Sequence, residues 1–299
     1  MAHHHSHGHN HAVTSLNTIF TACILINFSF VLIEAGVGFW YNSLGLLSDA
    51  GHNLSDVFSL LLSLLAFRIS QHRSNRHFTY GYKKSTILAS LVNAIILLIA
   101  VGAIAIESLY KLKNPEPTSG LAISWTAGTG ILVNGITAWL LMKNQKHDLN
   151  VRGAFLHMLM DTLVSVGVVV SGVIILHTGL AIIDALIGLA IAAIILATTW
   201  KLLKESLYLS LDAVPENIDL KSIEQIISNI PGINSWHHLH IWAVSTTENA
   251  ATLHIVIENL SNMHSIKQTL KGELHRQGIQ HTTIECETPD SICEEKCCC

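Results

Sequence analysis

Long apolar stretches follow one another through the first two thirds of the chain. Each holds about 20 or more mostly apolar residues, which is the length that an α-helix needs to cross a bilayer. The pattern therefore predicts an α-helical membrane domain of six transmembrane helices within residues 15–205. We place these helices at 15–40, 44–68, 84–110, 120–142, 153–177 and 180–203.

The pattern changes from about residue 206, where helical and strand-like periods alternate. Their αββαβ order predicts a small cytoplasmic α+β domain at 206–287, ferredoxin-like or metallochaperone-like, with an antiparallel sheet. Asp219 is the expected N-cap of its first helix. We place the helices at 219–229 and 263–277, and the strands at 235–244, 251–258 and 281–287.

Both ends of the chain are polar and rich in metal-binding side chains. Residues 1–14 begin MAHHHSHGHNHA, and the interruptions between the His residues favour a natural His-rich arm over an expression tag. Residues 288–299 form a Cys-rich tail that has too little apolar content to fold. Thiols at this end offer thiolate for zinc or copper(I). They are Cys286, Cys293, Cys297, Cys298 and Cys299.

Composition agrees with a membrane protein and gives no indication of a nucleic-acid partner. Only 13% of the residues are charged and 50% are hydrophobic, whereas a soluble domain carries about 25% charged residues. The net charge of -4 leaves no basic footprint for nucleic acid. The unusual feature is the 19 His residues, because imidazole titrates near neutral pH and binds metals.

Basic residues gather on one side of the predicted membrane, whereas the opposite side has only Lys111 and Lys113. Because Lys and Arg mark the cytoplasmic side, we expect a multi-pass protein with both termini in the cytoplasm. A bacterial inner membrane and a eukaryotic vesicle or plasma membrane are both compatible with this pattern. The residues on the basic side are Arg68, Arg73, Arg76, Lys83, Lys84, Lys143, Lys146, Arg152, Lys201 and Lys204.

Two identically spaced pairs of ionisable residues lie inside apolar helices. His52 and Asp56 are four residues apart, and His157 and Asp161 repeat that spacing about a hundred residues later. Residues at this spacing share one helix face. An Asp inside a bilayer costs at least about 2.5–3.5 kcal/mol, so such residues serve function or pair internally. Together the pairs offer two nitrogens and two oxygens, which are ligands of tetrahedral zinc.

The same ligands also provide a way to release the metal. His must be neutral and Asp ionised to bind, so metal binding expels protons and protonation expels metal. A proton gradient can therefore drive metal outward. Two further acids are weaker candidates: Asp49 and Glu34 line an ion path, or pair internally with Asn27, Asn53 or a helix end. Because Asp49 precedes His52 by three residues, we expect it to support the ligands rather than coordinate the metal.

These motifs resemble the cation diffusion facilitator family over nearly the whole chain, and most closely its bacterial zinc exporters and animal vesicular zinc transporters. The resemblance implies a homodimeric zinc/proton antiporter that alternates between inward-facing and outward-facing states. It also implies that the two His/Asp pairs form the transport site, with cobalt and cadmium as secondary ions. The matching segments are NSLGLLSDAGHNLSD at 42–56, FTYGYK at 78–83, DLNVRGAFLH and the following residues at 148–161, and HHLHIW at 237–242.

The resemblance further implies a metal site in the cytoplasmic domain that regulates transport. His237 and His254 match metal ligands of a site at the cytoplasmic dimer contact. Zinc loading there would draw two tail domains together and bias the membrane helices toward transport. Further candidates are His264 and Glu287, which fall near the other positions of that site, and His240 and His281, which we expect to be neighbours on adjacent strands.

Two more family positions fall in and near the loop between the second and third predicted helices. His72 and His77 lie where some relatives bind a second ion, although they are equally compatible with two solvated loop residues. Lys83 and Asp212 match a charge interlock at the membrane edge of the dimer. Positive-inside topology for Lys83 and a helix cap for Asp212 are the simpler explanations.

Two other functions use a similar buried His/Asp site. An intramembrane metalloenzyme needs an open coordination position, a general base and substrate access. The chain has no HExxH motif, and four protein ligands close the coordination sphere, so the sequence disfavours this function. A membrane metal sensor binds without moving ions, and only a flux measurement separates it from a transporter.

Overall fold

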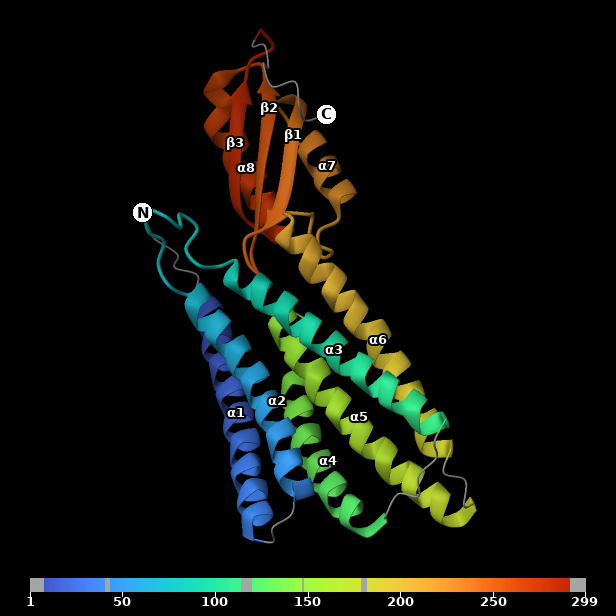
Figure 1. Cartoon of the computed structure of the whole chain (residues 1–299). Helices are drawn as coiled ribbons and strands as arrows, with labels where there is room; N and C mark the ends of the chain where they lie inside the picture. Colours follow the sequence, from blue (N-terminus) through green and yellow to red (C-terminus); the bar gives the residue numbers. More distant parts are fainter. Residues whose placement is uncertain (1–7, 41–43, 114–119, 147, 179–181, 291–299) are drawn as a thin grey trace.

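The computed structural model describes residues 8–40, 44–113, 120–146, 148–178 and 182–290. Within these ranges, six long helices form one elongated bundle, and a sheet with two further helices forms a smaller unit at one end of it (Figure 1). The bundle helices are α1 (Gly8–Trp40), α2 (Leu44–Ser70), α3 (Ser85–Lys113), α4 (Gly120–Met142), α5 (Leu149–Thr178) and α6 (Ile182–Ser210).

The bundle is a helical membrane region. Among the described residues, three helical stretches are long and apolar enough to cross a bilayer: Thr18–Val37 in α1, Ser85–Lys113 in α3 and Ala185–Ser210 in α6. A shorter apolar stretch, Gly128–Met142, lies in α4. The outer surface of α3 exposes large apolar side chains, Ile99 among them at 69% exposure, as contact with lipid requires.

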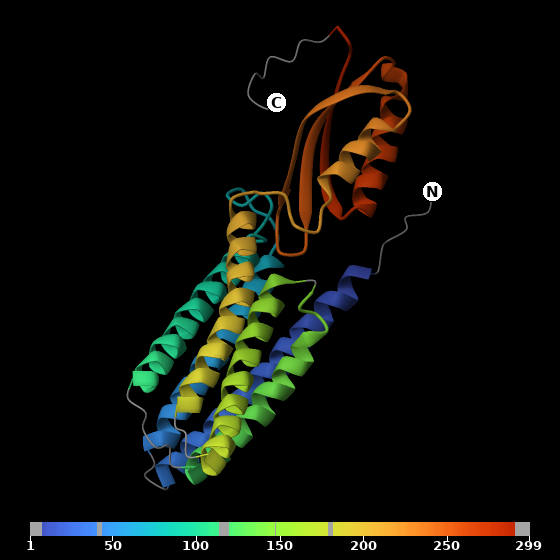
Figure 2. The same cartoon turned by 90° about the vertical axis from the view of Figure 1, so that its right-hand side faces the viewer.

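Small and polar side chains join the bundle helices. α3 and α6 lie side by side (Figures 1 and 2), and Ser90 of α3 and Ser206 of α6 form a buried hydrogen bond of 2.8 Å between their hydroxyls. Asn27 of α1 donates to the hydroxyl of Thr137 in α4 at 2.9 Å. In lipid, where apolar side chains gain little by leaving the solvent, close packing and hydrogen bonds of this kind hold helices together.

The smaller unit, called the tail domain below, is a three-stranded sheet with both helices on one face (Figures 1 and 2). Its core consists mainly of Ile and Leu side chains from the strands and from one face of each helix. The carboxylate of Asp219 accepts a hydrogen bond from the backbone N–H of Lys221 at 3.1 Å, which confirms the predicted N-cap. The elements are α7 (Leu220–Ser228), β1 (Ile233–Ala243), β2 (Asn249–Ile257), the short helix η1 (Leu260–Asn262), α8 (Met263–Arg276) and β3 (Ile279–Glu287).

The predicted antiparallel sheet was wrong, because the sheet is mixed. β1 and β2 form an antiparallel hairpin, but β3 runs parallel to β2. The reason is the α8 crossover, which returns the chain to the start of β2 before β3 begins. The strand order β1-β2-β3 also overturns the expected adjacency of His240 and His281: they face Thr252 and Ala250 from opposite sides of the central strand.

The turn between β1 and β2 points at the helical bundle (Figure 1). We call residues 245–248 the hairpin tip. The hydroxyl of Ser245 accepts hydrogen bonds from the backbone N–H groups of Thr247 and Glu248, at 3.2 and 3.0 Å, and the N–H of Val244 bonds to the carbonyl of Glu248. These bonds fix the shape of the tip, so a contact that holds the tip also holds the ends of β1 and β2.

Candidate metal centres

A buried cluster of one imidazole and two carboxylates lies between α2 and α5. Asp56 comes from α2, and His157 and Asp161 come from one face of α5, with 1%, 4% and 7% of the residues exposed. His157 Nε2 lies 2.6 Å from Asp56 Oδ1 and 3.8 Å from Asp161 Oδ2. The backbone of His52 lies in α2, one turn before Asp56, but its side chain and that of Asp49 are outside the described residues.

The spacing of this cluster suits a small divalent cation. Tetrahedral zinc with bonds of about 2.0–2.2 Å places its ligand atoms about 3.3–3.6 Å apart. The two contacts of His157 fall on either side of that spacing, and one ligand atom from each residue lies within 4.8 Å of the others. At 2.6 Å the imidazole nitrogen and the Asp56 oxygen form a hydrogen bond, whose proton lies between two atoms that could bind a metal. The cluster can therefore hold a proton, which a metal would replace.

Another buried acid, Glu34, contacts the part of α2 that precedes Asp56. Glu34 of α1 is 5% exposed and accepts a hydrogen bond of 2.8 Å from the side-chain amide of Asn53. This contact confirms internal pairing with Asn53, one of the roles expected for Glu34. It ties α1 to the segment of α2 that carries the ligands.

A second cluster lies on the face of the tail-domain sheet that α7 and α8 leave open. It joins His237 of β1, His254 of β2 and Glu287 of β3. His254 Nδ1 lies 2.7 Å and His237 Nε2 lies 3.3 Å from the same oxygen of Glu287. The strand pairing places His237 opposite His254, and a bulge follows at His238, whose φ is 51°. The three side chains offer the nitrogen and oxygen ligands that zinc accepts.

The other tail-domain candidates do not join this cluster. His240, His264 and His281 are exposed, and His264 lies on α8, on the opposite side of the sheet. The thiol of Cys286 packs against the apolar core, and burial raises its pKa, which disfavours the thiolate form. The remaining predicted thiols are outside the described residues: Cys293, Cys297, Cys298 and Cys299.

The loop candidates make local contacts. His72 and His77 are exposed, and His72 Nδ1 lies 3.1 Å from the backbone carbonyl of Arg68. Neither joins a group of metal-ligating atoms among the described residues, so a second ion there stays a prediction. Asp212 pairs with Lys84 at 2.6 Å, and Lys83 pairs with Glu248. These pairs lie within one chain, so an interlock between two copies also stays a prediction.

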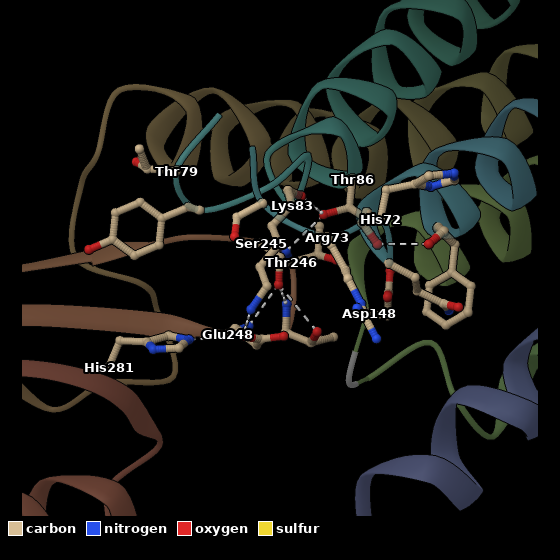
Figure 3. Close-up of a pocket in the computed structure, with 16 residues that line it drawn as sticks. His72, Arg73, Thr79, Lys83, Thr86, Asp148, Ser245, Thr246, Glu248 and His281 are labelled. Atoms are coloured by element: carbon tan, nitrogen blue, oxygen red, sulfur yellow. Dashed lines mark hydrogen bonds and ion pairs between the residues drawn. The ribbon is translucent and has the colours of Figure 1, made fainter. Parts of the chain in front are cut away.

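The hairpin tip meets the helical bundle beside a polar cavity of about 710 Å³ (Figure 3). Glu248 contacts Lys83 and lies 3.3 Å from His281 Nε2. Burial acts to raise the pKa of Glu248, but hydrogen bonds and charges from Lys83 and His281 outweigh it and lower the pKa. The backbone N–H of Thr246 donates to the hydroxyl of Thr86 at 3.1 Å. The tail domain is thereby fixed to the start of α3.

Asp148 and Asn150 extend this contact to the start of α5. The Asp148 carboxylate accepts a hydrogen bond of 2.7 Å from the N–H of Asn150, whose side-chain amide donates to the carbonyl of Thr86 at 2.9 Å. Burial raises the pKa of Asp148, although hydrogen bonds from Asn150 and Val151 oppose this effect. Sequence reasoning missed Thr86, Asp148 and Glu248 as contact residues, because polar residues outside apolar runs carry no pattern that distinguishes them.

Comparison with known proteins gives two family matches that together cover most of the chain. The cation efflux transmembrane domain matches residues 20–209. The cytoplasmic domain of cation efflux proteins matches residues 215–289.

Individual bacterial proteins are similar over almost their whole length. The cadmium, cobalt and zinc/H(+)-K(+) antiporter of Bacillus subtilis is 34% identical over 286 residues, which are 94% of this chain and 92% of the relative. The metal cation efflux system protein CzcD of Cupriavidus metallidurans is 34% identical over 292 residues, with 95% and 92% covered. The zinc transporter ZitB of Pectobacterium atrosepticum is 32% identical over 286 residues, with 94% and 89% covered.

Proposed function

Because this chain belongs to the cation efflux family, whose members are transporters and not enzymes, we propose that it exports zinc in exchange for protons. His52, Asp56, His157 and Asp161 are the proposed ligands of the transported ion. The observation that carries the proposal is the buried cluster of Asp56, His157 and Asp161 between two bundle helices. The relatives, named for zinc, cadmium and cobalt, support these ions as substrates.

The proposed ligands exchange protons for metal by simple competition. Each ligand atom binds either a proton or the metal, so zinc enters only as the proton of the hydrogen bond between Asp56 and His157 leaves. On the side with the higher proton activity, protonation of the imidazole and carboxylates releases the ion. Alternating access of the site to the two sides turns this competition into export driven by a proton gradient.

We propose a homodimer embedded in the lipid bilayer, with six membrane helices in each chain and both termini in the cytoplasm. The proposed parts are a His-rich arm at 1–14, a membrane domain at 15–205, a cytoplasmic domain at 206–287 and a Cys-rich tail at 288–299. The basic loops support this orientation, because they lie at the end of the bundle that meets the tail domain. Metal would then load from the cytosol.

The tail-domain cluster is proposed to hold a regulatory zinc ion. Its His237, His254 and Glu287 atoms are separated by distances close to those of a zinc coordination sphere, and the three side chains are only partly buried. In this proposal cytosolic zinc binds the tail domains, favours their association and biases the membrane helices toward transport.

Flux in proteoliposomes tests the proposed function. The purified chain is reconstituted with a zinc-sensitive dye inside and an imposed pH gradient, and zinc and proton movements are recorded together. Asp161→Ala is expected to abolish zinc flux by removing a ligand from the buried cluster. Glu107→Ala is the matched control, since Glu107 is an exposed acid of α3 that contacts Lys111 at 3.1 Å, and it is expected to leave flux unchanged.

The same assay separates transport from sensing. Zinc binding without flux would show a metal sensor and contradict the proposal, as would flux that is unchanged in Asp161→Ala. Zinc flux that ignores the pH gradient would contradict proton coupling alone. Repeating the assay with cobalt, cadmium and manganese defines the range of transported ions.

A further inference from the structure

A buried polar cluster joins α2 to α3 and has no place in the function proposed so far. Ser59 of α2 donates a hydrogen bond of 3.2 Å to the side-chain carbonyl of Asn93 in α3. The Asn93 amide donates to the hydroxyl of Ser63 at 2.8 Å, and Ser63 donates to the backbone carbonyl of Ser59 at 3.2 Å. Exposure is 6% for Ser59, 0% for Ser63 and 1% for Asn93. We call these three residues the amide cluster.

The amide cluster lies about one helical turn from the proposed transport site along α2, and it contacts α5 about one turn before His157. Ser59 follows Asp56 by three residues in α2, and Gly153 precedes His157 by four residues in α5. A Cβ atom at Gly153 would lie 3.5 Å from Asn93 Cβ and 3.8 Å from its amide nitrogen, so α5 passes directly over Asn93. One side chain of α3 thus touches both helices that carry ligands.

α3 contacts both α2 and α5, so its position determines how these two helices lie relative to each other. It packs along α6 through apolar side chains of one shared core, among them Ala94 and Leu97 of α3 and Ile195 and Leu202 of α6. In an apolar bundle, an amide with two bonded hydroxyl partners fixes both the rotation and the height of one helix against another. Asn93 therefore sets where α2 sits relative to α5, and with it the separation of the Asp56 and His157 side chains.

We propose that Asn93 is a positioning residue for the transported ion, and that its bonds to Ser59 and Ser63 tune the site for zinc over the larger cadmium ion. This proposal rests on the proposed function above. Among the described residues, the side chain of Asn93 hydrogen-bonds to Ser59 and Ser63 and not to Asp56, His157 or Asp161. It acts by holding α2 and α5 at the spacing that short zinc bonds require.

The test compares variants that break the amide cluster with one that breaks a similar bond elsewhere. Asn93→Leu keeps the branched shape of the side chain but removes both hydrogen bonds to α2. Ser59→Ala with Ser63→Ala removes the same bonds from the other side with little change in volume. Ser90→Ala is the matched control, because it removes one buried hydrogen bond of α3 that leads to α6 instead. All are purified as full chains, checked for folding by thermal unfolding, and assayed for zinc and cadmium flux.

We expect both amide-cluster variants to raise the KM for zinc about tenfold, the lower end of the effect seen when supporting partners of metal ligands are removed. The ratio of cadmium to zinc flux should rise with it. Combining Asn93→Leu with the two Ser substitutions should add no further change, since all act on one set of bonds. Ser90→Ala should leave the KM and the ion preference as they are in the unmodified chain, even where its melting temperature falls.

Zinc binding in detergent, measured by calorimetry in a His254→Ala background that removes the tail-domain cluster, provides a readout independent of flux. Unchanged zinc affinity and ion preference in both folded amide-cluster variants would overturn the positioning role. An equal shift in Ser90→Ala would also overturn it, by showing a general effect of packing. If the unmodified chain bound zinc without transporting it, the proposed function would fail, while the binding affinities would still decide the role of Asn93.

Discussion

We expect zinc binding at the tail-domain cluster to raise the thermal stability of the chain, and we expect His254→Ala to abolish this rise. His254 stands at the centre of the cluster, with Nδ1 2.7 Å from Glu287 and Nε2 3.5 Å from Glu285. Its alanine variant leaves one imidazole and one carboxylate of the three clustered ligands. Because zinc sites that retain three or four protein ligands bind far more tightly than sites with two, we expect the variant to lose most of its tail-domain affinity.

The size of the effect follows from binding to the folded state alone. At a zinc concentration 100 times the Kd, one site stabilises the folded state by about 2.7 kcal/mol. Each kcal/mol raises the melting temperature of a large chain by about 2 °C or more, so the expected rise is about 5 °C. The ligand atoms need little movement to accept the ion: 2.7 and 3.3 Å separate the Glu287 oxygen from the two imidazoles, against about 3.3 Å in tetrahedral zinc.

Thermal unfolding of the full chain in detergent, with and without zinc, measures this rise. The Asp161→Ala background removes one ligand of the buried cluster of Asp56, His157 and Asp161, so that the difference caused by His254→Ala reports on the tail domain. His240→Ala is the matched control, because His240 is an exposed imidazole on the neighbouring strand β1 and lies outside the cluster.

Two results would refute this reasoning. A zinc-dependent rise of the same size in His254→Ala would place the ion elsewhere. A rise that His240→Ala removes would show that the exposed imidazole, and not the half-buried cluster, holds the metal.

Three further expectations can be checked by similar measurements. Glu248→Gln should lower the free energy of unfolding by about 1 kcal/mol at pH 7, as for partly exposed ion pairs. Because folding lowers the pKa of Glu248, this difference is present above the unfolded pKa and should vanish as the pH falls through the folded pKa. Unfolding measured at several pH values checks both expectations. Leu253→Ala, at a core position with 1% exposure, should destabilise the tail domain by about 2–5 kcal/mol in denaturant unfolding, and a loss below 1 kcal/mol would contradict the assigned core. Cys286→Ser should leave zinc affinity unchanged in calorimetry, since that thiol packs against the core, so a weaker affinity would mean that it reaches the cluster.

Much of the membrane domain could be predicted from apolar periodicity. The described bundle helices overlap the expected ranges, although α1 begins seven residues earlier and α6 ends seven residues later than expected. His157 and Asp161 share one face of α5 as expected, and that face meets Asp56 of α2. The local patterns in the tail domain likewise gave the order of its helices and strands. These features depend on residues near one another in sequence, which is where hydrophobic spacing and capping act.

Contacts between distant segments were not predictable in the same way. The parallel pairing of β3 depends on where α8 returns the chain, and no residue of β3 encodes it. Asn93 stands in the sequence as one amide in an apolar run, and only the fold brings it to Ser59 and Ser63. Glu248 and Lys83 are 165 residues apart, so their pairing is a property of how the two domains meet.

The β1–β2 hairpin has a length that the protein cannot freely change. From His237 opposite His254 to Ala243 opposite Asn249, β1 spans six residue steps, or about 20 Å at the rise of a strand. One end of this span holds the tail-domain cluster, and the other meets Thr86 and Lys83. A single inserted residue would turn His237 toward the apolar core, and two would keep its face but move it by about 7 Å. We therefore expect insertions in the tail domain to be tolerated in its other loops and not within this hairpin.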